Sequence, residues 1–168
     1  ALAEAVSIRK APHMFGWDIL PRVVSAGLWR DVNLEIIPPT HWRSVYWVTK
    51  NVDVENRTAS MYVDWEFATD RLDIDDLTLE ITLERNGKTA FEKSINVYTT
   101  VSRERIDGLQ DIDFWWPRGF GDPALYNAAL VIRDAEGKVL CENRQQIGIR
   151  TAELVRTEVN TRENPGEF

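Results

Sequence analysis

The first residues with chemical potential lie in the stretch FGWDILPR, which spans residues 15–22 near the start of the chain. Trp17 and Asp18 stand side by side within it. Both residue types suit sugars, because an aromatic ring covers apolar C–H groups and a carboxylate accepts hydrogen bonds. A proline close behind an acidic residue is equally typical of a tight turn. The stretch therefore leaves two alternatives open, the edge of a sugar-binding pocket or a turn that packs its own hydrophobic residues.

Other residue types that could do chemistry form no motif. The two histidines are far apart and Cys141 is the only cysteine, so zinc-binding spacing and an internal disulfide are both absent from the sequence. No G-x-S-x-G motif or phosphate-binding glycine loop occurs, and no pair of acids stands out for glycoside cleavage. Four aspartates crowd one loop without the glycine and final glutamate of a calcium loop, namely Asp70, Asp73, Asp75 and Asp76. We expect a solvated acidic turn there, no metal and no cofactor.

The composition limits the partners of the chain. Its 168 residues carry a net charge of −7, which disfavours nucleic acid because phosphates are held by clustered lysine and arginine. A hydrophobic content of 43% is enough for one well-buried core. No apolar run approaches the ~20 residues needed to cross a bilayer. We therefore expect a soluble domain with no nucleic-acid or membrane partner, in an unknown compartment, with a periplasmic or secreted location preferred to a cytoplasmic one.

The elements that must position these residues are predicted to be strands. Apolar and polar residues alternate from residue 58 to 67, and again from 77 to 84, where Asn86-Gly87 marks a turn into residues 88–98. Further strands are expected at residues 45–55, 125–133, 139–149 and 150–158. About seven strands between residues 41 and 156 predict an all-β fold, an immunoglobulin-like antiparallel β-sandwich with an N-terminal extended arm.

Several aromatic residues receive structural roles from this pattern. Trp47 and Trp65 are expected in the core, and Tyr126 is expected to act as a tyrosine corner whose hydroxyl bonds nearby backbone. The stretch Trp115-Trp116-Pro117 is expected to plug one end of the sandwich, with a docking surface for another domain as the alternative. Within the arm, we expect residues 32–36 to pair with a strand edge or to pack beneath the sandwich, of this or a neighbouring molecule, because a lone strand cannot satisfy its backbone.

Five stretches then resemble one known family, in the same order along the chain: IRKAPHMFGWDILPR, GLWRDVNLE, WWPRGFGDPALY, IGIRTAEL and NPGEF. They are similar to the region of glycoside hydrolase family 2 around its second domain, and the β-mannosidases are the nearest branch. The resemblance implies a retaining exo-β-glycosidase in which a jelly-roll domain precedes an immunoglobulin-like sandwich and a catalytic (β/α)8 barrel. Under it, residues 1–40 are the tail of the jelly roll, 41–156 the sandwich, and 157–168 the approach to the barrel.

The resemblance also assigns roles in the intact enzyme. Both catalytic glutamates of the family lie on the barrel, the acid/base one directly after an asparagine, and this chain holds no Asn-Glu dipeptide. Retaining cleavage needs two carboxyl groups about 5–5.5 Å apart, so we expect no turnover from this chain. Trp17 and Asp18 correspond to a loop that reaches toward the sugar, although Ile19 and Leu20 replace the Trp-Gly common in the branch and leave the sugar open. Local turn capping is the alternative role for Asp18.

Three functions compete on this basis. The first is a noncatalytic spacer that orients the jelly roll and the barrel, so that its partners are the other domains of the same polypeptide and a β-linked sugar. The second is a self-standing carbohydrate-binding module, which needs exposed aromatic rings at Trp42, Trp115 and Trp116. The third is an immunoglobulin-like adhesion or receptor domain. Surfaces that normally face other domains could also pair two copies into a homodimer.

Overall fold

A computed structural model describes residues 7, 9–153 and 162 of the chain. The chain divides into two compact units, residues 1–36 and residues 37–168, and each is described by itself. Within the described residues, no helix is long and apolar enough to cross a membrane.

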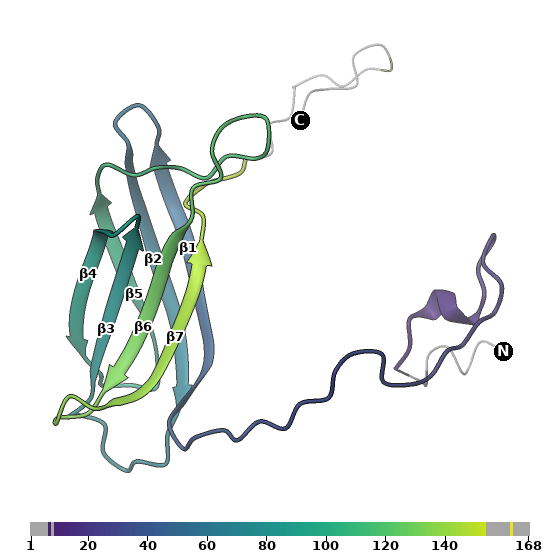
Figure 1. Ribbon diagram of the computed structural model, residues 1–168, viewed down its shortest axis with the longest axis horizontal. Helices are drawn as coiled ribbons and strands as arrows, with labels where there is room; N and C mark the ends of the chain where they lie inside the picture. The colour runs from purple at the N-terminus through teal and green to yellow at the C-terminus, as the bar shows by residue number, and fades with distance from the viewer. Residues whose placement is uncertain (1–6, 8, 154–161, 163–168) are drawn as a thin grey trace. The chain divides into compact units, whose positions relative to one another are not determined.

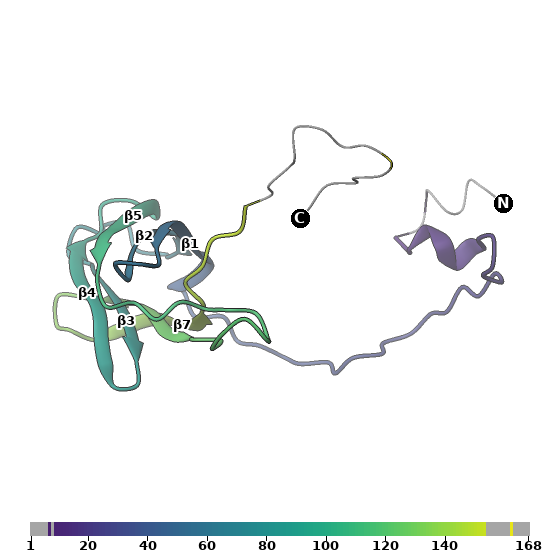
Figure 2. The ribbon, with the colours of Figure 1, turned by 90° about the horizontal axis from the view of Figure 1, so that it is seen from above.

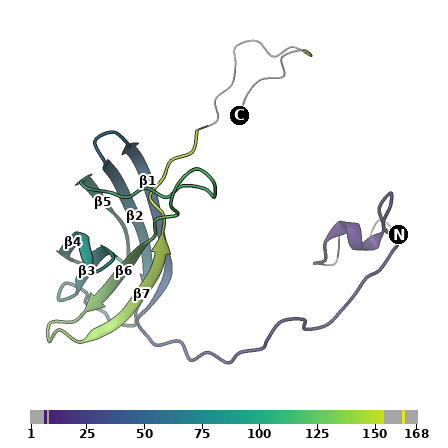
Figure 3. The ribbon, with the colours of Figure 1, turned by 45° about the horizontal axis from the view of Figure 1, so that its top comes forward.

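The second unit is built from antiparallel strands, as the sequence predicts (Figure 1). Their bounds are β1 (His41–Asp53), β2 (Thr58–Ala68), β3 (Thr78–Arg85), β4 (Lys88–Asn96), β5 (Val101–Leu109), β6 (Tyr126–Arg133) and β7 (Val139–Ile147). One sheet has the order β1-β2-β5 and the other β4-β3-β6-β7. Figure 2 and Figure 3 show the two sheets as separate layers facing each other. This confirms the predicted all-β sandwich.

Alternation along the strands places the core between the sheets. The residues of β2 that were predicted to share one face are all buried: Ala59, Met61, Val63, Trp65 and Phe67. From the facing sheet, the apolar row of β3 and residues Leu130 and Ile132 of β6 are fully buried against them. Burial of a large aliphatic side chain contributes about 1.5–3 kcal/mol, so this double row is the main source of stability.

Two details of the predicted strands are corrected by the structure. β5 was not predicted, because its inward positions include Ser102 and Glu104, and only Ile106 and Leu109 are buried apolar residues. Pairing with β2 makes it a strand in spite of its polar sequence. Conversely, a strand was expected at residues 150–158, but residues 150–153 form none and the remainder lies outside the described residues.

Polar side chains close both open edges between the sheets. On one edge, Lys93 of β4 and Glu104 of β5 point inward and form an ion pair with 2.5 Å between Nζ and Oε1. On the other edge, the Gln145 side-chain amide of β7 donates a hydrogen bond to the Val45 carbonyl of β1 over 3.3 Å. Inward-pointing polar groups on edge strands discourage pairing with other chains. The sandwich is therefore tied across both edges.

The first unit contains a short 3-10 helix, η1 (Pro12–Phe15), and a tight turn directly after it. Residues 32–36 form no strand, and the side chains of Val32, Leu34 and Ile36 are exposed. The segment therefore forms no strand within the first unit, and its docking on a sandwich, of this or a neighbouring molecule, stays a prediction. Apolar residues at every second position of an arm bounded by proline do not by themselves provide a partner strand.

Candidate functional site

The two residues predicted to contact a sugar lie in a turn of the first unit. Trp17 and Leu20 exchange two backbone hydrogen bonds of 3.1 Å each, and Asp18 and Ile19 form the tip between them. Gly16 precedes the turn with a φ of 111°, a conformation that side chains disfavour, which explains a glycine at this bend. The backbone N–H of Val23 returns to the Met14 carbonyl at 3.1 Å and closes the loop.

The geometry of this turn leaves both side chains at the surface. The Trp17 side chain is 72% exposed, and Asp18 is exposed beside it. Within the described residues, the Asp18 carboxylate accepts no hydrogen bond, since the turn is closed by backbone groups alone. The turn-capping role considered for Asp18 is therefore not seen. An exposed ring next to an exposed carboxylate is chemically able to contact a sugar, and this assignment stays a prediction.

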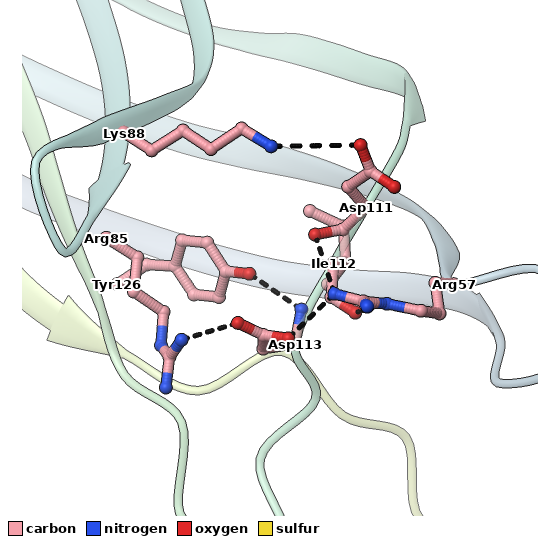
Figure 4. A network of polar contacts seen from close by, with 7 residues as sticks. All are labelled: Arg57, Arg85, Lys88, Asp111, Ile112, Asp113 and Tyr126. Atoms are coloured by element: carbon pink, nitrogen blue, oxygen red, sulfur yellow. Dashed lines mark hydrogen bonds and ion pairs between the residues drawn. The ribbon is translucent and has the colours of Figure 1, made fainter.

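A polar network occupies one end of the sandwich (Figure 4). Asp113 lies at its centre, where its carboxylate accepts from Arg57 at 2.8 Å and from Arg85 at 2.5 Å. Arg57 also donates to the Asp111 carbonyl at 3.3 Å, and Lys88 lies 3.7 Å from the Asp111 carboxylate. The network joins the turn after β1, the end of β3 and the segment after β5. It fixes the start of the long connection between β5 and β6.

Tyr126 completes this network as the tyrosine corner that the sequence predicts. Its hydroxyl oxygen accepts the backbone N–H of Asp113 at 2.9 Å, and the residue is 3% exposed. Burial raises the pKa of the Tyr126 hydroxyl, partly offset by that hydrogen bond. The hydroxyl therefore stays protonated and serves a structural role. Sequence reasoning found the tyrosine but missed Arg57, Arg85 and Asp113, because these partners are far apart in the chain and no local pattern links them.

The connection itself carries the two adjacent tryptophans. Trp115 is half-buried, and its backbone N–H donates to the Ile149 carbonyl at 3.1 Å. Trp116 is 39% exposed and lies against Gly121, while its N–H donates to the Asp122 carbonyl at 3.0 Å. Further along, Phe120 is 79% exposed. The loop thus packs part of its aromatic surface against its own sandwich and exposes the rest to solvent.

The exposure of Trp42, Trp115 and Trp116 separates a carbohydrate-binding module from a spacer. Trp42 packs against the core, with its ring centroid 6.4 Å from that of Trp65 and 6.0 Å from that of Phe67. Trp115 is covered by Gly148 and by the Arg150 guanidinium, so Trp116 alone is exposed among these three tryptophans. A platform of coplanar exposed rings is therefore not formed by these residues.

The remaining candidates have structural surroundings. Asp76 pairs with Arg71 at 2.5 Å, and the Asp73 side chain accepts the backbone N–H of Asp75 at 2.9 Å, so these acids order their own loop. Burial raises the pKa of the Cys141 thiol to about 11, which leaves it unreactive near neutral pH. Among the described residues, no group of three or more histidine, cysteine, aspartate or glutamate side chains could hold a metal ion.

Comparison with known proteins agrees with this architecture. The model of the family "Glycosyl hydrolases family 2" matches residues 43–150. Beta-mannosidase B of Aspergillus terreus is 31% identical over 150 residues, and that of Aspergillus niger is 32% identical over 153. Each match covers 89% of this chain and 17% of the relative, so the chain spans about a sixth of the length of these proteins.

Solved structures share the fold. A candidate beta-galactosidase of Bacteroides fragilis superposes with a TM-score of 0.60 at 24% identity, covering 70% of this chain and 19% of that one. Beta-glucuronidase 2 of Bacteroides uniformis gives a TM-score of 0.56 at 17% identity over 68% of this chain and 15% of its own. At these identities the likeness concerns the fold.

Proposed function

The chain belongs to glycosyl hydrolase family 2, and we propose that its sandwich is the noncatalytic second domain of a retaining exo-β-glycosidase of the β-mannosidase type. In this role it spaces and orients a jelly-roll domain and a catalytic barrel during carbohydrate degradation. Residues 1–40 are then the end of the jelly roll, 41–156 the sandwich, and 157–168 the approach to the barrel. The observation that carries the proposal is the match of residues 43–150 together with the short span of the relatives that the chain covers.

The surface of the sandwich supports a spacing role over a catalytic one. Its polar residues at the network end are engaged in ion pairs with each other, since Asp113 is shared by Arg57 and Arg85. Exposed apolar residues lie on the same connection, with Trp116 at 39%, Phe120 at 79% and Leu125 at 42% exposure. Apolar residues gathered next to polar ones are typical of protein-facing surfaces. We infer that this end faces another domain of the same polypeptide.

The turn at Trp17 and Asp18 is proposed to belong to the sugar site of the intact enzyme. The support is its shape, which holds the exposed Asp18 carboxylate at the tip and the exposed Trp17 ring beside it. A carboxylate can accept two sugar hydroxyls while the ring covers the C–H face. The sugar would be a β-linked one.

Catalytic assays separate the spacer from an enzyme. We expect the purified chain to release no p-nitrophenol from aryl β-mannoside or aryl β-galactoside above a blank, because the acid pair of retaining glycosidases belongs to another domain. Turnover at rates typical of enzymes, about 1–10³ s⁻¹, would overturn the proposal. The coding sequence after residue 168 gives an independent check, since a barrel with a later Asn-Glu pair is expected.

Calorimetry separates the spacer from a carbohydrate-binding module. Mannobiose and cello-oligosaccharides are expected to give no heat of binding to the chain at millimolar concentration, because Trp42, Trp115 and Trp116 form no exposed platform. A matched Trp116→Ala variant should behave identically. Saturable binding that the variant loses would favour the module.

A further inference from the structure

We propose that Trp115 clamps the segment Gly148–Arg150 and so fixes the direction in which the chain leaves strand β7. The clamp joins two stretches of the sequence that lie more than twenty residues apart, WWP at residues 115–117 and IGIR at 147–150. Figure 1 shows the loop before β6 beside the chain after β7. The clamp itself rests on contacts within the sandwich, and its effect on the orientation of a following domain rests on the proposed function.

Three kinds of interaction hold the segment in place, and two of them involve Trp115 directly. The Trp115 N–H donates to the Ile149 carbonyl at 3.1 Å, which fixes the backbone. The Arg150 guanidinium carbon lies 4.2 Å from the centroid of the Trp115 ring, a cation–π distance. The side chain of Ile149 has 0% exposure and is part of the core. The segment is thus held by a hydrogen bond and burial at Ile149 and by a ring contact at Arg150.

Gly148 makes the contact possible by having no side chain. A Cβ at this position would lie 2.7 Å from Cγ of Trp115 and 2.8 Å from its Cβ and Cδ1. Real Cβ atoms do not approach that closely, and the Trp115 Cβ is bonded to the backbone, so a rotation of the side chain cannot relieve its contact without moving the loop. Space against Trp115 is therefore a physical reason for glycine at this position.

The loop that carries Trp115 is itself anchored, so the clamp has a fixed side. Asp113, two residues earlier, is held by Arg57 and Arg85 through its carboxylate and by the Tyr126 hydroxyl through its backbone. Trp116 packs on Gly121, where an added Cβ would lie 2.8 Å from its Cγ. Because Trp115 contacts residues 148–150 where the chain leaves the core, the chain can leave in few directions. A domain attached after residue 150 would inherit the direction.

Distance measurements between two spin labels test the clamp on the chain as it stands. Labels at Glu92→Cys and Thr151→Cys, in a Cys141→Ala background, report where the exit points relative to β4. We expect one narrow distance distribution in the parent, and loss of that single narrow peak in Gly148→Ala and in Trp115→Ala. Phe120→Ala is the matched control, because it removes an exposed aromatic side chain of the same loop without touching the exit or the anchor, and it should keep the narrow peak.

Hydrogen exchange gives a second readout that does not depend on labels. The amide of Trp115 should exchange at least tenfold faster in Gly148→Ala than in the parent, because its acceptor at Ile149 is displaced. Arg150→Ala is expected to broaden the distance distribution while leaving the core intact, which covers the case in which Gly148→Ala fails to fold. Unchanged distributions in folded Trp115→Ala and Arg150→Ala would overturn the clamp. That result would leave the spacer role standing, whereas hydrolysis or sugar binding by the chain would remove the spacer role and leave the clamp.

Discussion

The sandwich and the N-terminal unit differ in how far their apolar residues are buried. In the sandwich, apolar residues at every second position are buried, and Leu83 and Leu130 have 0% exposure. In residues 9–36, comparable residues face solvent, with Leu28 at 86%, Trp29 at 82% and Leu34 at 96%. Both regions are rich in apolar side chains, but among the described residues a second layer covers them in the sandwich alone. Hydrophobic content alone therefore does not make a core, and pairing of two alternating sheets does.

Truncation of one leucine in each region tests this contrast most strongly. Leu130→Ala should lower the free energy of unfolding by about 2–5 kcal/mol, since a fully buried leucine loses its contacts and leaves a cavity. Leu34→Ala should change it by less than about 0.5 kcal/mol, because the side chain is already in water. Urea unfolding followed by tryptophan fluorescence measures both. Equal losses in the two variants would show that Leu34 is covered in solution.

Thiol reactivity sharpens the same contrast. Cys141 faces the core from β7, and burial raises its pKa from 9.0 to about 11. Near pH 8 it should react with a disulfide reagent roughly one to two orders of magnitude more slowly than in urea, since the thiolate is the attacking form. A Leu34→Cys thiol in a Cys141→Ala background is the matched control and should react as it does in urea.

The pH dependence of that reaction has a fixed sign. A thiol whose pKa is raised in the folded state favours folding below about pH 9, and this contribution is lost as the pH rises toward 11. The reaction rate of the folded protein should therefore keep rising over this interval. A plateau near pH 9 would mean that Cys141 is as solvated in the fold as in the unfolded chain.

The same contrast explains what could be predicted from the sequence. Alternation of apolar residues identified β2 and β3, and the position of Tyr126 at a strand start after Pro123 identified its role, because these signals are local. β5 was missed because it owes its place to pairing with β2, and its polar inward residues carry no period. The network at Asp113 and the contact of Trp115 with Gly148 were missed for a related reason, since each joins residues far apart in the chain.

Removal of one hydroxyl probes how much the network end adds to the sandwich. Tyr126→Phe should lower the free energy of unfolding by about 1–2 kcal/mol, because the part-buried Asp113 N–H loses its acceptor while the ring stays in place. Tyr46→Phe is the matched control, since that side chain is 67% exposed and should tolerate the change. Differential scanning calorimetry compares the two. A Tyr126→Phe variant as stable as the parent would show that water replaces the hydroxyl.

The smallest expected effect concerns two arginines that lie over aromatic rings, one in each region. Arg103 lies 3.9 Å from the centroid of Tyr62 and binds the Asp64 carboxylate through Nε at 2.6 Å and Nη2 at 2.8 Å. Arg30 lies 4.2 Å from the centroid of Trp29 in the first unit. The hydrogen bonds from Arg103 lower the pKa of Asp64 below 3.8. Exposed ion pairs contribute little to stability, so the pKa is the sensitive measure.

Arg103→Gln should raise the pKa of Asp64 toward 3.8, measured by NMR titration of its side-chain carbonyl. A carboxyl with a lowered pKa stabilises the fold above its unfolded value, and this contribution is lost as the pH falls through the folded value. The variant should therefore differ slightly from the parent near pH 7 and match it in strong acid. Arg30→Gln should match the parent at every pH. If Arg103→Gln leaves the Asp64 titration unmoved, the arginine binds the carboxylate only transiently in solution.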